Sequence, residues 1–236
     1  MYLVDWLGCG GSERPVVKCA AGLASDFFTV SLHDWMRAEG IESANIVAHS
    51  LGGLIAKDFS DKFPYTVANL VLVSPAGFGS APAKNPAETF GRQLLDMLWS
   101  SNVTPQQIVR IAGKVRGHNL VTRAVQGRFS HLPSFNVHLL ADYLYEITVA
   151  RPSGEYALNA LLSPPFQRGA VVARKPITSF QPGLPVHVLF GDRDWLGTPT
   201  AIENAANTGA RVSIMMNATH HLYLDRPAEF ARLCVD

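Results

Sequence analysis

The chain has 236 residues, a formal net charge of +1, 47% hydrophobic residues and 17% charged residues. This composition predicts one globular domain with a sizeable core, and the near-neutral charge gives no reason to expect a nucleic-acid partner. The three cysteines lack metal-ligand or redox spacing, which favours a reducing compartment. No apolar run reaches about 18 residues, so no transmembrane helix is expected.

The chain begins with the letters MYLVDW, which are typical of the end of a strand. No secretory leader is visible, so we expect an intracellular protein, either cytoplasmic or peripheral to membranes. A glycine-rich loop follows at residues 5–15. A dinucleotide-binding loop would run directly into a helix, whereas Pro15 interrupts this one. We therefore predict no cofactor.

Helices and strands then alternate. Ser25 or Asp26 can cap a helix that ends before Gly40. A strand near 46–48 leads into a second helix, which Pro64 stops, and a continuously apolar strand follows at 69–74. Apolar strands joined by helices predict a parallel sheet that is buried on both faces.

The letters A-H-S-L-G at residues 48–52 match a nucleophile elbow, with Ala48 in the first small position. Small residues are needed there because the serine sits on a sharp, strained turn between a strand and a helix. This turn would raise the Ser50 hydroxyl above the sheet, and backbone N–H groups of the helix behind it would face developing negative charge. The alternative is a serine that only caps a helix.

Between residues 80 and 165 the pattern becomes helical, with segments expected near 90–99, 105–115 and 135–150. We interpret this region as an insertion over the carboxyl end of the sheet, where doubly wound proteins bind ligands. The predicted division is therefore core at 1–79, insertion at 80–165 and core again at 166–236. The apolar face of the last segment is expected to pack in a core more readily than to contact lipid.

Two further strands, expected at 186–190 and 211–216, are each followed by residues that can carry chemistry. Asp194 follows the first strand and His220 the second, and a final helix is expected at 227–233. The order Ser50, Asp194, His220 is that of the α/β-hydrolases. Of the two acids after the first strand, Asp194 is the candidate, because Asp192 fits a turn-forming role better. Of the two histidines after the second strand, His220 is favoured over His221.

The three side chains form a chemical unit. A serine hydroxyl is a poor nucleophile until an imidazole removes its proton, and a carboxylate fixes the imidazole tautomer. His49, beside the serine, is expected to be a packing residue. A metal site at His220 and His221 with Asp225 is disfavoured because no H-E-x-x-H or comparable pair accompanies them.

Several stretches carry a more specific resemblance: residues 5–15, the elbow, 71–78, 142–155 and 220–227. Together they are similar to one α/β-hydrolase subfamily, over nearly the whole chain. That subfamily contains the lipid-droplet lipase coactivator of neutral lipid storage disease, N-acyl-phosphatidylethanolamine lipases and cardiolipin deacylases.

The resemblance implies a serine esterase or lipase that cleaves or transfers acyl groups of glycerophospholipids, with the insertion as a lid. Ser50 would attack the acyl carbonyl, His220 would carry the proton and Asp194 would orient His220. The Leu51 N–H would supply one oxyanion donor. His220 and Asp225 reproduce an H-x4-D signature associated with acyl transfer, although Asp225 is more simply explained as a helix cap before Pro227. A lipid or acyl-ester substrate is implied, and peripheral contact with a membrane or lipid droplet is left open.

The sequence also departs from this subfamily. Members carry an oxyanion loop that begins His-Gly, and the first strands of the sheet, upstream of the position of Asp5. We therefore expect an N-terminally truncated chain with an exposed sheet edge and without one oxyanion donor, which is worth about 3–4 kcal/mol. A catalytically weak or inactive lipase-regulating or lipid-binding fragment is the alternative function, and a hydrolase of small esters or amides is a third.

Overall fold

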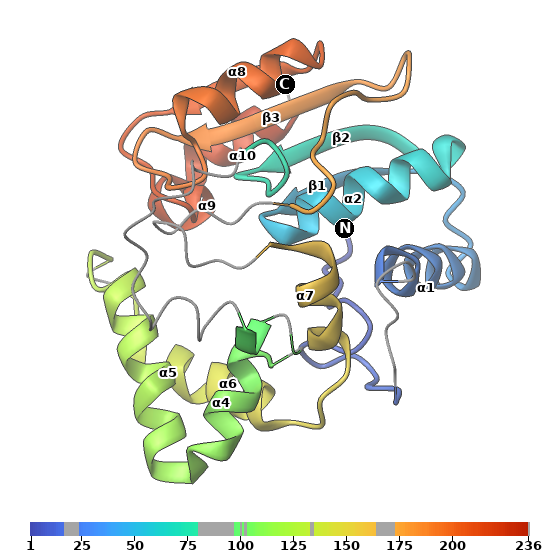
Figure 1. The fold of residues 1–236 in the computed structure, drawn as a ribbon. Helices are drawn as coiled ribbons and strands as arrows, with labels where there is room; N and C mark the ends of the chain where they lie inside the picture. The colour runs from blue at the N-terminus through green and yellow to red at the C-terminus, as the bar shows by residue number, and fades with distance from the viewer. Residues whose placement is uncertain are drawn as a thin grey trace.

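The computed structural model describes residues 1–16, 24–79, 97–99, 101, 103–132, 135–163 and 173–235. Within these residues the centre of the fold is a sheet whose neighbouring strands all run parallel, in the order β1-β2-β3-β4 (Figure 1). All four strands lie where the apolar runs predict them: β1 (Ala44–His49), β2 (Val67–Val73), β3 (Val186–Gly191) and β4 (Arg211–Met215). The predicted α/β class is confirmed.

Helices cover both faces of the sheet, as a doubly wound fold requires. One face packs against α1 (Ala24–Ala38), α2 (Leu51–Lys62) and α8 (Pro199–Asn207), and the other against α9 (Leu222–Asp225) and α10 (Pro227–Val235). Side chains of β2 alternate between the faces, because successive residues of a strand point in opposite directions. Leu72 joins the first cluster and Val73 the second.

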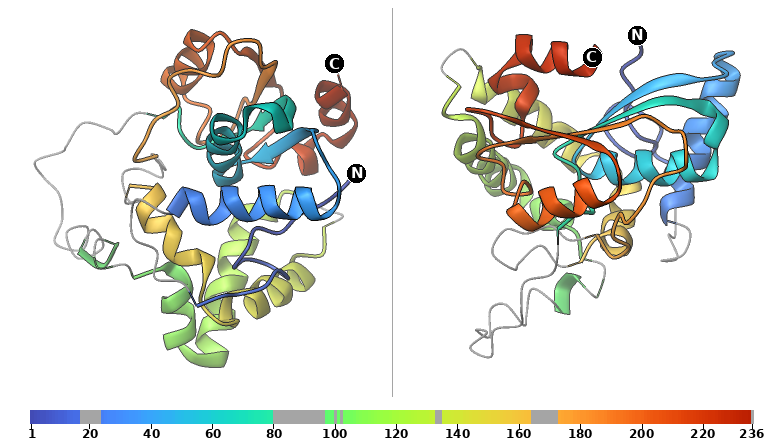
Figure 2. Two further views of the ribbon diagram at one scale, coloured as in Figure 1. Left: turned by 90° about the vertical axis from the view of Figure 1, so that its right-hand side faces the viewer. Right: turned by 90° about the horizontal axis from the view of Figure 1, so that it is seen from above.

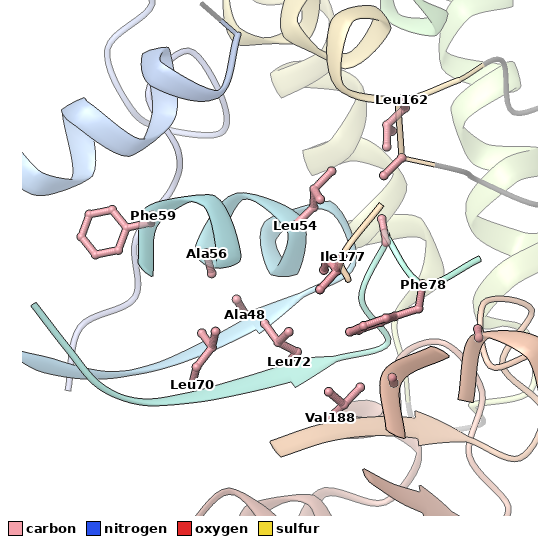
Figure 3. Packing of buried hydrophobic residues seen from close by; sticks show 14 of the residues in the cluster. Ala48, Leu54, Ala56, Phe59, Leu70, Leu72, Phe78, Leu162, Ile177 and Val188 are labelled. Carbon is pink, nitrogen blue, oxygen red and sulfur yellow. The ribbon is translucent and has the colours of Figure 1, made fainter. Parts of the chain in front are cut away.

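The larger cluster lies between α2 and the sheet (Figure 3). Phe59, Leu72 and Val188 there are fully removed from water. Burial of one such side chain is worth roughly 1.5–3 kcal/mol, so this layer fixes the position of α2 on the strands. Because α2 begins directly after Ser50, the same packing positions the elbow.

One edge of the described sheet is β1, which pairs with β2 alone among the described strands, and the other is β4. Val47 on β1 is 51% exposed, because the face shared with Val73 carries no described helix over this strand. The prediction of a strand at residues 2–5 is wrong: these residues have no regular structure, and Leu3 is 92% exposed. A strand needs a hydrogen-bonded neighbour, and none of the described strands pairs with this segment.

The helical region between β2 and β3 contains α4 (Pro105–Ile111), α5 (Gly113–Phe129), α6 (Val137–Val149), a short 3-10 turn (Gly154–Ala157) and α7 (Leu158–Leu161). The helices α4, α5 and α6 stand apart from the strands as a separate group (Figures 1 and 2). The sequence suggested one helix over 105–115. The chain instead bends at Gly113, whose φ of 75° interrupts the helix, and α5 then continues to Phe129.

Other predictions for this region have mixed outcomes. Of the helix expected at 90–99, only 97–99 lie within the described residues, and they are helical. On α6, Leu144 packs in a cluster with Phe129, as expected, whereas Leu139 and Tyr143 are exposed. The division at 79/80 and 165/166 stays a prediction, because neighbouring residues lie outside the described ranges. None of the described helices combines the length and apolar character needed to cross a membrane.

The N-terminal loop and the end of the helical region touch through their backbones. Gly8 and Gly154 lie so close that a Cβ on Gly8 would collide with the Gly154 backbone. The Gly154 N–H donates to the Gly8 carbonyl at 3.2 Å. The guanidinium of Arg14 adds hydrogen bonds to carbonyls on both sides, including those of Gly10 and Ile147. This junction holds the base of the insertion against the core.

Candidate active site

Ser50 occupies the strained turn that the sequence pattern predicts. It joins β1 to α2 with φ of 55° and ψ of −121°, which non-glycine residues rarely adopt. Three backbone hydrogen bonds hold it: the Ser50 N–H donates to the Val73 carbonyl at 2.9 Å, and the Ser50 carbonyl accepts from the N–H groups of Gly53 and Ala76 at 3.0 Å each. The tightest space is at Gly53, where a Cβ would lie 2.9 Å from that of Pro75. Packing on both sides therefore maintains the strain.

The three side chains proposed from the sequence lie in one hydrogen-bonded line. His220 Nε2 is 3.0 Å from Ser50 Oγ, and His220 Nδ1 is 2.9 Å from Asp194 Oδ1. A carboxylate can only accept, so Nδ1 carries the proton and Nε2 is left to accept from the serine hydroxyl. Asp194 and His220 are 7% and 2% exposed. The arrangement is suited to proton removal from Ser50.

The environment of Asp194 favours its ionised form. Burial alone would raise the pKa of Asp194, but the hydrogen bond from His220 and that from the Leu196 N–H outweigh it, together with the nearby Ser74 side chain. The net pKa of Asp194 is lower than usual. The carboxylate is therefore charged at neutral pH, as a group that stabilises an imidazolium must be.

Asp192, the other acid of this turn, accepts a hydrogen bond from the backbone. Its Oδ1 accepts from the Ala218 N–H at 3.0 Å, which ties the turn after β3 to the turn that carries His220. The Arg193 N–H donates to the Ala218 carbonyl at 3.0 Å and adds to the same connection. Gly191 is required here because a Cβ would collide with that carbonyl. The acid and the histidine are thus placed by one joined pair of turns.

His49 has a role that sequence reasoning missed. Its Nε2 donates to the backbone carbonyl of His220 at 2.9 Å, and its ring lies 4.6 Å from the His220 ring. Burial, followed by the neighbouring His220, lowers the pKa of His49 to about 4. A neutral His49 therefore holds the backbone of His220. Its position next to Ser50 was the available signal.

The adjacent histidines His220 and His221 each pack against an aromatic side chain. Trp195 packs on the His220 ring with centroids 4.0 Å apart, and Phe129 of α5 packs on His221 at 4.8 Å. His221 bonds to the Tyr223 hydroxyl at 3.0 Å, and burial is the main reason that its pKa falls to about 3. Trp195 was missed in the sequence, although it directly follows Asp194.

The predicted helix-capping role of Asp225 is wrong, whereas its part in the H-x4-D signature stays a prediction. Its carboxylate accepts from both the N–H and the hydroxyl of Thr219, at 2.6 Å each, and from His131 Nε2 at 2.8 Å. It makes no hydrogen bond with His220, and it lies at the end of α9 rather than capping α10. Asp225 therefore supports the residue before His220 and links it to the insertion.

Leu51, the expected oxyanion donor, is the first residue of α2. Its N–H has no hydrogen-bond partner among the described residues, as expected for the first turn of a helix. The remaining histidines of the core lie elsewhere: His33 stacks on Phe63, and His187 bonds to the Ser213 hydroxyl.

Known proteins match this chain both in sequence and in structure. A family model described as the alpha/beta hydrolase fold matches residues 1–227. A 1-acylglycerol-3-phosphate O-acyltransferase of Arabidopsis thaliana is 32% identical over 245 residues, which cover 96% of this chain and 57% of that protein. A human (Lyso)-N-acylphosphatidylethanolamine lipase is 30% identical and is covered to 68%, with 98% of this chain aligned.

Solved structures agree on the fold. An enol-lactonase from Burkholderia xenovorans LB400 superposes with a TM-score of 0.63 at 20% identity, covering 98% of this chain and 78% of that one. The esterase RhEst1 from Rhodococcus sp. ECU1013 gives 0.57 at 17% identity, with 97% and 76% covered. The chain spans less than three-fifths of the length of the matched plant acyltransferase. By its family match and its sheet, the chain belongs to the α/β-hydrolase fold family.

Proposed function

We propose that this protein is a serine hydrolase that cleaves or transfers acyl groups of glycerophospholipids. The observation that carries the proposal is the line from Ser50 Oγ through His220 to Asp194, with distances of 3.0 and 2.9 Å. The lipid substrate class is supported by relatives named for 1-acylglycerol-3-phosphate acyl transfer and for N-acylphosphatidylethanolamine lipolysis.

In the first half-reaction, Ser50 Oγ attacks the acyl carbonyl carbon while its proton moves to His220 Nε2. The tetrahedral intermediate then loses the glycerol oxygen, which takes that proton, and an acyl-serine remains. In the second half, a water or an acceptor hydroxyl gives its proton to His220 and attacks the acyl carbon. The Ser50–acyl bond breaks and the proton returns to Ser50.

Negative charge develops on the carbonyl oxygen in both halves. The unpartnered Leu51 N–H is the donor that we assign to it, since it leads the helix behind the serine. Asp194, ionised and buried, stabilises the imidazolium that forms on His220. A purely lipase-regulating role is not favoured, because an assembled hydrogen-bonded line of this kind has no use without chemistry.

Intact mass measured after exposure to a fluorophosphonate tests the nucleophile. One adduct on the unmodified chain, none on Ser50→Ala and one on Ser43→Ala, an exposed serine used as the control, are the expected results. Absence of the adduct on a folded chain would contradict the proposal. Fatty acid release and acyl transfer to an added lysophospholipid, measured together by mass spectrometry, would then divide hydrolysis from transfer.

A further inference from the structure

A positive charge from the insertion stands beside the candidate triad. Arg128 lies in the last turn of α5, and its guanidinium carbon is 4.5 Å from the centre of the Trp195 ring. The same ring packs on the imidazole of His220 at 4.0 Å. The guanidinium and the histidine that bonds to Ser50 therefore contact the same indole.

This charge has no counter-ion among the described residues, since none of their carboxylates forms an ion pair with Arg128. Other arginines nearby in the fold are neutralised: Arg110 pairs with Glu155, and Arg193 lies 3.8 Å from Asp192. The Arg128 side chain stays exposed, so a ligand can reach it. Neighbouring protein lowers the pKa of Arg128 by displacing water, yet arginine remains protonated in proteins.

Two other basic groups of this corner, His49 and His221, are neutral at pH 7. The pKa values of His49 and His221 fall to about 4 and about 3, chiefly through burial, and the charge of Arg128 contributes to both shifts. Two unprotonated imidazoles cannot satisfy an anion by charge. The guanidinium is therefore the group on the insertion side that would attract one.

The hydrogen-bond donors of Arg128 are available for anion recognition. Its contact with the Trp195 ring is accompanied by no hydrogen bond from the guanidinium to another described residue, so its N–H groups can make two parallel hydrogen bonds to a phosphate. The next residue, Phe129, is buried and packs on His221, so the end of α5 is held over the site. The charge is thus placed by packing.

We propose that Arg128 binds the phosphate group of the substrate and makes the site selective for acyl esters that carry phosphate close to the ester bond. This inference rests on the proposed function. In a glycerophosphate ester, only the three glycerol carbons and two ester oxygens separate the acyl carbon from phosphorus. A cation that contacts the same indole as the catalytic histidine suits that spacing, whereas a neutral acylglycerol has no group to offer it.

Paired substrates test the assignment. Fatty acid release is measured from 1-oleoylglycerol 3-phosphate and from 1-oleoylglycerol, for the full chain and for Arg128→Gln, Arg128→Lys and Arg123→Gln. Arg123 is exposed on the same helix and serves as the matched control. Arg128→Gln should raise KM about tenfold or more for the phosphate ester only, because a charge-assisted bidentate contact is lost. The KM of Arg128→Lys for the phosphate ester should lie between those of Arg128→Gln and the parent. Arg123→Gln should have the same KM as the parent.

An equal loss on both substrates would overturn the proposal and would mean that Arg128 only clamps the insertion onto Trp195. An unchanged KM on both would overturn it as well. Fluorophosphonate labelling of Ser50 in each variant separates this failure from failure of the proposed function, because labelling does not require phosphate recognition.

Binding in the Ser50→Ala background keeps the assignment testable even without turnover. Calorimetric titration should show tighter binding of 1-oleoylglycerol 3-phosphate than of 1-oleoylglycerol, and Arg128→Gln should remove the difference. Inorganic phosphate should compete only at much higher concentration. Competition by inorganic phosphate as effective as that by the lipid would overturn the assignment to substrate and would leave a general anion site.

Discussion

The two sides of the candidate site are held in place by different means. The core side is positioned through the backbone: a strained Ser50, two turns joined at Ala218, and strand ends aligned by the sheet. The described residues of the insertion reach the site through side chains, such as Arg128 on Trp195. Backbone contacts resist displacement, whereas long side chains can change rotamer. This difference fits our two proposals, in which the core supplies the chemistry and the insertion supplies the selectivity.

The largest effect should come from the core side. Asp194→Asn should lower kcat by roughly ten-thousandfold, because an amide allows the wrong tautomer of His220 to form. KM should change little, since the carboxylate does not face the substrate. Steady-state kinetics on an activated ester measures this, and circular dichroism checks the fold. A loss below tenfold would mean that another acid orients His220.

Gly191→Ala should break the joint between the two turns. The added Cβ would collide with the Ala218 carbonyl, which is backbone and cannot swing away. We expect the free energy of unfolding to fall by about 1–3 kcal/mol, as in other overpacked sites. Gly127→Ala on α5 meets no atom within 4 Å and should instead gain about 0.5–1 kcal/mol from helix propensity. Urea denaturation measures the free energy of unfolding of both variants. Equal changes in the two variants would contradict the prediction.

Lowering the pH should reduce the free energy of unfolding, because two partly buried histidines of the core side are neutral in the folded state. The folded-state pKa values of His49 and His221, about 4 and about 3, lie below the ordinary value of 6.5. Their contribution to stability is therefore complete above pH 6.5 and is lost as the pH falls toward 4, because the unfolded chain takes up the protons first. Each histidine adds at most about 1.4 kcal/mol per pH unit to this slope.

Denaturation at a series of pH values between 7.5 and 4.5 measures the slope. His49→Gln should flatten it, whereas His138→Gln, at an exposed position of α6, should leave it unchanged. The stability contributed by carboxylates with lowered pKa values, such as Asp194, begins to fall only below about pH 5, so the slope above that pH reports the histidines. A slope that is the same in His49→Gln would show that His49 is not buried in neutral form.

The smallest effect should come from the contact between the insertion and Asp225. His131→Ala removes a pair whose side chains are 44% and 5% exposed, so we expect a cost below about 1 kcal/mol. Asp225→Ala also deprives the Thr219 N–H and hydroxyl of their partner and should cost about 1–3 kcal/mol. Chemical denaturation ranks the two variants. Equal costs would mean that the bond from His131 contributes as much stability at Asp225 as the bonds from Thr219.

The sequence was most informative where local chemistry determines structure. Alternating apolar strands and helices predicted the sheet, and the spacing around Ser50 predicted the strained turn, because few residues tolerate that backbone. The strand ends after β3 and β4 placed Asp194 and His220 at the same edge, since parallel strands end together. Geometry agrees with this placement at 2.9 Å.

The missed features depend on contacts between distant segments. Nothing in the local pattern indicates that His49 bonds to the His220 carbonyl, or that Arg128 meets Trp195. The break at Gly113 was missed because helical periodicity continues on both sides of it. Residues 2–5 were misjudged for the opposite reason: their composition suits a strand, but pairing decides whether a strand forms.

The contact between Gly8 and Gly154 has a consequence for how the protein can vary over evolution. A Cβ on Gly8 would collide with the Gly154 backbone, and a Cβ on Gly154 would lie 2.8 Å from the carbonyl oxygen of Leu7, the residue before Gly8. Neither position can therefore drift alone while the junction persists. Among relatives that keep the insertion we expect both glycines to be retained, and where the insertion is replaced we expect both to be released together.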